Sequence, residues 1–135
     1  MKFTVNREEL INMLNVVSKV TASKTTTFII EGVKFTVAEG AITLEATDLE
    51  QAIIAKLYPL SVEGESEFVV MPQRIMQALR ELTDTEVTLS TDEVNFVIHG
   101  SVGTFKFRRM GAEDFPLIER FPEEGFYDLD AQPLQ

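Results

Sequence analysis

The sequence predicts an α+β fold built from two related halves, and three observations support this prediction. Residues 3–17 alternate polar and apolar residues like a strand and then continue with the spacing of an amphipathic helix. The same order returns 65 residues later, and β-rich runs follow both copies. Self-similarity at a fixed offset is typical of a duplicated supersecondary unit. The matching apolar pairs are Phe3 with Phe68, Val5 with Val70, Leu10 with Ile75, Ile11 with Met76, Leu14 with Leu79, and Val17 with Leu82.

The first half is expected to begin with a strand at 2–5 and a helix capped by Asn6, because Asn6 and Glu9 have the spacing of a reciprocal helix cap. The buried stripe of this helix would consist of Leu10, Ile11, Leu14 and Val17, and its outer side of Glu8, Asn12, Asn15 and Lys19. The rest of this half predicts a polar loop at 21–27, a hairpin of strands 28–37 and 41–46 that turns at Glu39-Gly40, and a strand at 52–60.

The second half repeats this order. A strand at 67–70 leads into a helix that starts near Pro72, which suits a first helical turn because its missing N–H is not needed there. The buried stripe would be Ile75, Met76, Leu79 and Leu82, with Gln73, Gln77 and Arg80 outside. Short strands are expected at 87–89, 94–98 and 104–107, and a further strand at 126–129 looks like the start of another unit.

Composition limits the classes of function. The 135 residues suffice for one core, and the absence of cysteine excludes disulfides and thiolate sites. No apolar run approaches the roughly 20 residues of a membrane span, so we expect a cytoplasmic protein without a membrane partner.

The net charge of −10 argues against binding to nucleic acid. However, residues 111–135 carry seven acids and one arginine, whereas the helices at 7–20 and 72–82 sum to 0 and +1. A helix face can therefore approach DNA without repelling it.

No pattern typical of an enzyme is present. His99 is the single histidine, without a nucleophile motif beside it, and a structural role is expected for it. Asp48 and Glu50 could share one face of a strand as metal ligands or paired acids, but a polar turn in which Asp48 bonds nearby backbone explains them better. We therefore expect no catalytic residue, no metal site and no cofactor.

Several segments resemble one family. These are MKFTV at 1–5, REELINMLNVVSKV at 7–20, TDLE at 47–50 and DFP at 114–116. In order and spacing they are similar to the N-terminal domain of the bacterial DNA polymerase III beta subunit, the sliding clamp. The resemblance implies the DNA-clamp fold: a duplicated βαβββ unit with two helices on one face of a curved antiparallel sheet.

The resemblance also implies how the chain is divided and what it does. Residues 1–122 would form the clamp N-terminal domain, with pseudo-repeats at about 1–62 and 66–110. Residues 123–135 would be a linker and the start of a truncated second clamp domain. The family's clamp is a ring-shaped dimer, a non-catalytic processivity factor that encircles duplex DNA and tethers DNA polymerase III. The clamp loader and the polymerase would bind domains that this chain lacks, and the fragment alone should bind DNA poorly.

Matching positions give the expected site residues. By resemblance, Lys24, Arg74 and Arg80 would contact DNA, although Gln73 stands where the family is often basic. Phe105, Phe107 and Arg74 would lie at the subunit interface with the second protomer. From the residues alone, Lys24 could be a solvated lysine, and alternating aromatics such as Phe105 and Phe107 are often core.

Two other functions stay open at this point. The chain could be an acidic protein-interaction module, possibly one that mimics DNA with its charge of −10, although its carboxylates gather in loops and in the tail. It could also be a small metal-dependent enzyme that uses Asp48 and Glu50, which would require these carboxylates to lie together.

Overall fold

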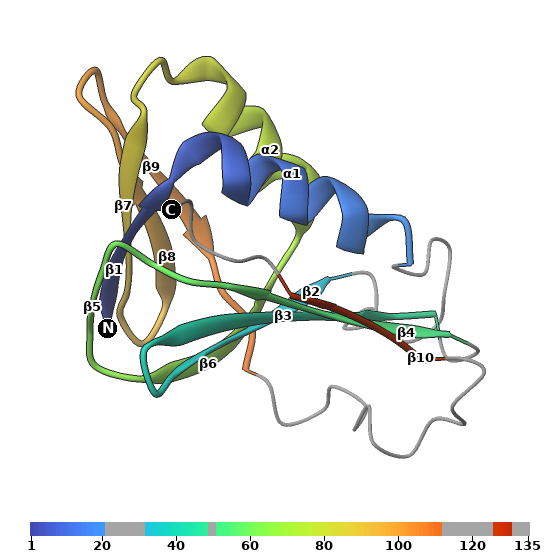
Figure 1. Ribbon diagram of the computed structural model, residues 1–135. Helices are drawn as coiled ribbons and strands as arrows, with labels where there is room; N and C mark the ends of the chain where they lie inside the picture. Colours follow the sequence, from blue (N-terminus) through green and yellow to red (C-terminus); the bar gives the residue numbers. More distant parts are fainter. Residues whose placement is uncertain (21–31, 49–50, 112–125, 131–135) are drawn as a thin grey trace.

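The computed structural model describes residues 1–20, 32–48, 51–111 and, as backbone, 126–130. Within this part of the chain, strands and helices follow the order that the sequence predicts, except for one additional short strand, β5 (Figure 1). The elements are β1 (Lys2–Asn6), α1 (Arg7–Ser18), β2 (Val33–Ala38), β3 (Ala41–Thr47), β4 (Ala52–Leu57), β5 (Ser61–Glu63), β6 (Ser66–Val70), α2 (Pro72–Glu81), β7 (Glu86–Thr91), β8 (Asn95–His99), β9 (Thr104–Arg108) and β10 (Phe126–Asp130).

The two halves exchange their first strands. The strands form two five-stranded sheets, with the orders β5-β1-β7-β8-β9 and β10-β4-β3-β2-β6. β1 of the first half pairs antiparallel with β7 of the second, and β6 of the second half pairs antiparallel with β2 of the first. Neither half therefore completes a sheet alone, and the duplicated unit folds as one domain.

The α+β fold is confirmed, but the strands form two sheets where one curved sheet was expected. Two short segments join the sheets. After β4, the N–H of Leu60 donates to the Thr4 carbonyl at 2.8 Å and β5 continues along β1. After β9, Met110 and Val69 exchange two backbone hydrogen bonds of 2.9 Å. Thr4 and Val69 are 65 residues apart, so the sequence repeat places both joints at equivalent positions.

Both helices lie side by side on the same side of the sheets, in the angle that the sheets form (Figure 1). α1 buries Leu10, Leu14 and Val17, and α2 buries Pro72, Ile75, Met76, Ala78 and Leu79. Ile11 was expected in the buried stripe of α1 but is only partly buried, because it lies at the margin of that stripe. The Asn6 half of the predicted reciprocal cap is confirmed, since the Asn6 side chain accepts a hydrogen bond from the Glu9 N–H at 3.0 Å.

One core lies between the sheets and the helices. At its centre three buried aromatic rings from three strands pack together: Phe35 of β2, Phe68 of β6 and Phe96 of β8. Their ring centroids lie 5.2 to 5.7 Å apart, within the range of favourable aromatic pairs. Because β6 is an exchanged strand, this cluster ties the two halves together.

Two predicted strands have different bounds. The strand expected at 52–60 ends at Leu57 as β4, and β5, from Ser61 to Glu63 on the other sheet, was not expected. The strand expected at 28–37 is seen as β2 from Val33, and its first residues lie outside the described part of the chain. The predicted turn at Glu39-Gly40 joins β2 and β3, with positive φ at both residues (54° and 78°), as tight two-residue hairpins require.

Candidate functional site

The outer sides of α1 and α2 form one polar surface. On α1 and its C-cap the exposed residues are Glu8, Asn12, Asn15, Val16 and Lys19, and on α2 they are Gln73, Arg74, Gln77, Arg80 and Glu81. Amides and a few charges of both signs thus share this surface. The formal charges of these exposed residues sum to +1, in contrast to the net charge of −10 of the whole chain.

The predicted DNA-contacting residues fall at different places. Arg80 is exposed on α2 and follows Gln73 and Gln77 along one face of the helix, by spacings of four and three. Arg74 is also exposed, but it lines a hollow together with Phe105 and Phe107 of β9. Lys24 lies outside the described residues. The helix surface therefore carries Arg80, whereas Arg74 belongs to the border between helix and sheet.

β9 is the last strand of its sheet, and among the described strands it pairs only with β8. Its side chains alternate. Phe105 and Phe107 are partly buried and pack against the core, whereas Lys106 and Arg108 are exposed. Phe105 and Phe107 therefore pack against the core, as expected for alternating aromatics, and also lie on a strand at the edge of the sheet. β9 presents unpaired backbone groups, with apolar side chains toward α2 and cations on its other face.

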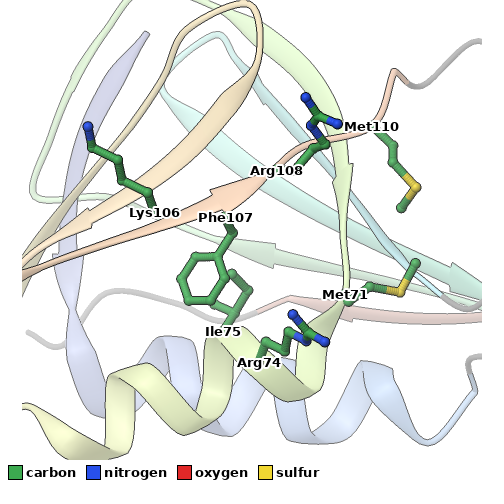
Figure 2. Close-up of a pocket in the computed structure, with 7 residues that line it drawn as sticks. All are labelled: Met71, Arg74, Ile75, Lys106, Phe107, Arg108 and Met110. Atoms are coloured by element: carbon green, nitrogen blue, oxygen red, sulfur yellow. The ribbon is translucent and has the colours of Figure 1, made fainter.

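A hollow of about 540 Å³ runs along this edge. Its lining consists of Met71, Arg74, Ile75, Lys106, Phe107, Arg108 and Met110. Figure 2 shows Phe107 pointing toward α2 beside Ile75, whereas Lys106 and Arg108 point away from the helix. Among the described residues, no carboxylate lies within 4.0 Å of the three cationic groups. The border between α2 and β9 is therefore a basic groove with an apolar floor, which we call the edge groove.

Sequence reasoning singled out Phe105, Phe107 and Arg74 but missed Lys106 and Arg108. The signal was present in TFKFR at 104–108, where cations alternate with aromatics. In a strand this alternation places the two kinds of side chain on opposite faces. Met71 and Met110 could not be found in this way, because they are brought to the edge groove by the junction of β6 with the end of β9.

The other candidates for chemistry lie apart from this border. His99 is exposed on β8 and its Nε2 lies 3.0 Å from the Ser90 hydroxyl on β7. Asp48 accepts a hydrogen bond from the Gln51 N–H at 2.8 Å, which is the polar turn expected there, and Glu50 lies outside the described residues. The described residues contain no cluster of three or more histidine or acidic side chains able to hold a metal ion. Nor does any helix of the described part have the length and apolarity to cross a membrane.

Comparison with known proteins gives one consistent result. The family described as DNA polymerase III beta subunit, N-terminal domain, matches residues 1–119. The chain is 30% identical to the beta sliding clamp of Chlamydia muridarum, with all of the chain and 37% of that protein aligned. It is also 30% identical to the beta sliding clamp of Salmonella typhimurium, with 96% of the chain and 36% of that protein aligned.

Solved structures agree with the sequence matches. The crystal structure of the DNA polymerase III beta subunit from Thermotoga maritima superposes with a TM-score of 0.82 at 32% identity, over 87% of this chain and 32% of that one. In all three comparisons the chain spans about a third of the relative's length.

Proposed function

Because the chain belongs to the family of DNA polymerase III beta subunits, we propose that it serves as the N-terminal domain of a replicative sliding clamp. Such a clamp encircles duplex DNA and tethers DNA polymerase III to it. The observation that carries the proposal is the common surface of α1 and α2, which lies on one side of the sheets and is polar and weakly charged. The complete ring would need further domains and a second protomer.

The charge of this surface suits a clamp that slides. A strongly basic lining would neutralise many phosphates and hold the DNA in place. Here Lys19 and Arg80 are accompanied by amide side chains such as Asn12, Asn15 and Gln77, whose phosphate contacts are weak and carry no sequence information. Enclosure of the DNA by the ring then keeps the protein on the DNA, while the helix surface makes only nonspecific contacts. Arg74 remains a proposed DNA contact at the border of this surface, and Lys24, which lies outside the described residues, remains one by resemblance.

We place the subunit interface at the free edge of β9. Backbone groups of an edge strand bind an added strand, and the side chains on its two faces select the partner. A partner strand along β9 would set apolar side chains beside Phe105 and Phe107 on the α2 side. On the other face, carboxylates would suit Lys106 and Arg108. Arg74 would contribute from α2, where it lines a hollow with both phenylalanines.

The internal repeat supports an added strand at this edge. β4 occupies in the first half the place that β9 has in the second, and β10 adds to β4 as a parallel strand. We therefore infer that each sheet ends in an edge suited to a further strand. Residues 123–135 would form the linker and the beginning of the next clamp domain, and the loader and the polymerase would bind beyond it.

The alternative of an acidic, DNA-mimicking module has no comparable support. A mimic needs carboxylates in regular array on one face, whereas the outer side of α2 carries Arg74, Arg80 and two glutamines beside Glu81. The clamp proposal also assigns no reaction to the chain.

The test uses the full-length protein that contains this chain, loaded onto nicked circular DNA. We expect it to co-elute with the circle in gel filtration at high salt and to be lost once the DNA is linearised, because enclosure fails at free ends. Equal retention on circular and linear DNA would disprove the topological function. Loss from both at high salt would mean that contacts alone hold the protein.

A further inference from the structure

The edge groove points to a ligand of its own, beyond the proposed function. We propose that it binds a small amphipathic anion, which is a carboxylate, sulfonate or phosphate group attached to an aromatic or aliphatic body. Three features of the groove point to such a ligand: its size, the division of its lining into apolar floor and cationic rim, and the lack of acids among the described residues that line it.

Size and floor suit the apolar body of such a ligand. The volume of about 540 Å³ lies within the range of roughly 300 to 1,000 Å³ of small-molecule sites. The floor combines the ring of Phe107 and the buried Ile75 with Met71 and Met110. Methionine side chains are flexible and polarisable, so they adapt to ligands of different outline. The floor therefore favours an apolar body without demanding one exact shape.

The rim suits the anionic group. Arg74 lines the groove from α2 near Met71, and Arg108 lines it from β9 near Met110, with its side chain directed away from the helix (Figure 2). Guanidinium groups bind carboxylates, sulfonates and phosphates through paired N–H donors. None of the described residues that line the groove is acidic, although the chain has 22 acidic residues against 12 lysines and arginines. This local excess of cations in an acidic protein selects anions and rejects neutral or cationic molecules of the same shape.

The ligand would also affect assembly, and this part of the inference rests on the proposed function. Arg74 and Phe107 belong both to the edge groove and to the proposed subunit interface. A molecule seated there would occupy the space that the side chains of a partner strand need. Ligand and partner strand would therefore exclude each other.

Two naphthalene dyes that differ in charge test the site on the 135-residue chain. The anion 8-anilinonaphthalene-1-sulfonate is titrated into 15N-labelled chain, and its neutral parent N-phenyl-1-naphthylamine serves as the matched probe. We expect one saturable site for the sulfonate, with NMR shift changes at 71–75 and 106–110. The neutral dye should bind roughly tenfold more weakly or worse, because it lacks the charged hydrogen bonds.

Variants then test whether Arg74 and Arg108 cause the preference for the sulfonate dye. Arg74→Gln combined with Arg108→Gln should remove the preference for the sulfonate, whereas Arg80→Gln, which changes an exposed arginine of α2 outside the groove, should retain it. Equal affinity of both dyes, shift changes elsewhere, or the same loss in Arg80→Gln would overturn the ligand site. If the sulfonate binds at the groove but leaves association of the full-length protein unchanged, the ligand site stands and the partner strand does not bind there.

Discussion

Arg7 of α1 bonds the last turn of α2, where its Nη1 donates a hydrogen bond to the Leu79 carbonyl at 3.0 Å. Its Nε donates to the Asp84 carbonyl, and its backbone N–H donates to the Thr85 carbonyl at 2.9 Å. The carbonyls at a helix C-terminus lack partners within the helix and carry partial negative charge, so a guanidinium there both caps and stabilises the helix. Arg7 therefore fixes the start of one helix to the end of the other, and so sets how the two helices form a common surface.

Replacing Arg7 with alanine should lower the free energy of unfolding by about 1 to 3 kcal/mol. The carbonyl groups of the α2 terminus lose charged hydrogen-bond donors at a partly buried position. Urea unfolding of the chain would measure this loss, and Arg7→Lys should recover part of it. Lys19→Ala provides a control on the exposed side of the same helical segment, with a change within about 0.5 kcal/mol. Equal effects at the two positions would show that the bonds to α2 do not matter.

Gly100 meets the buried Leu82 and leaves no room for a side chain. A Cβ at this position would lie 2.5 Å from Leu82 Cδ2 and 3.0 Å from Cδ1. Since Leu82 is buried after the end of α2, it can move only by disturbing the core. Gly100→Ala should therefore destabilise the chain by about 1 to 3 kcal/mol in thermal or urea unfolding.

Two comparisons isolate the cause of the Gly100→Ala effect. Gly103→Ala, in the same β8–β9 hairpin, adds a Cβ that meets nothing within 4 Å and should be nearly silent. In a Leu82→Ala background the contact disappears, so adding Gly100→Ala should cost much less than it does in the parent chain. An undiminished cost in that background would attribute the effect to the backbone at Gly100 instead of to Leu82.

Asp92 in the turn between β7 and β8 gives a defined pH dependence. The N–H of Asn95 donates to its carboxylate at 2.7 Å and the N–H of Val94 at 2.8 Å, and these bonds hold the pKa of Asp92 below its ordinary value of 3.8. Because the folded chain has the lower pKa, this contribution to stability is complete above about pH 4 to 5 and declines as the pH falls through the lowered value. The melting temperatures of Asp92→Ala and the parent chain should therefore differ at pH 7 and converge near pH 2. A difference that stays constant over this range would exclude ionisation of Asp92 as the cause.

Periodicity predicted the parts of this fold that depend on local spacing. The stripe of α2 was right at Ile75, Met76, Leu79 and Leu82, all of which are buried. Hydrophobic periodicity succeeds there because each helical face is determined by residues three and four positions apart. The same local logic identified Asn6 as a cap and placed the turn at Glu39-Gly40.

Contacts between distant residues could not be predicted in this way. Nothing in the apolar pattern of β1 indicates that it pairs with β7 instead of joining β2 and β3, so the exchange of first strands and the division into two sheets were missed. The bond between Arg7 and Leu79 spans 72 residues and was equally invisible. At the candidate site, the resemblance to the family singled out Phe105 and Phe107, whereas their alternation alone suggested core residues, and the edge groove also needed α2 and Met110 to meet β9.

The charges of β9 offer the sharpest test of the proposed interface. In the full-length protein, Lys106→Glu combined with Arg108→Glu should weaken association of the protomers at least about tenfold, because both cations face the side on which a partner strand would carry carboxylates. Sedimentation velocity over a concentration series measures this change, and the parent protein should show association that weakens with added salt.

Lys2→Glu, on β1 in the interior of the same sheet, is the matched charge reversal and should leave association intact. The positions on β9 are exposed, so the double variant should keep the thermal stability of the parent, whereas Lys2→Glu places a second acid opposite Glu63 and association is compared at a temperature at which this control is folded. If the protein with Lys106→Glu and Arg108→Glu associates as tightly as the parent protein, the two cations of β9 do not hold the partner protomer at this edge. The interface must then be sought elsewhere.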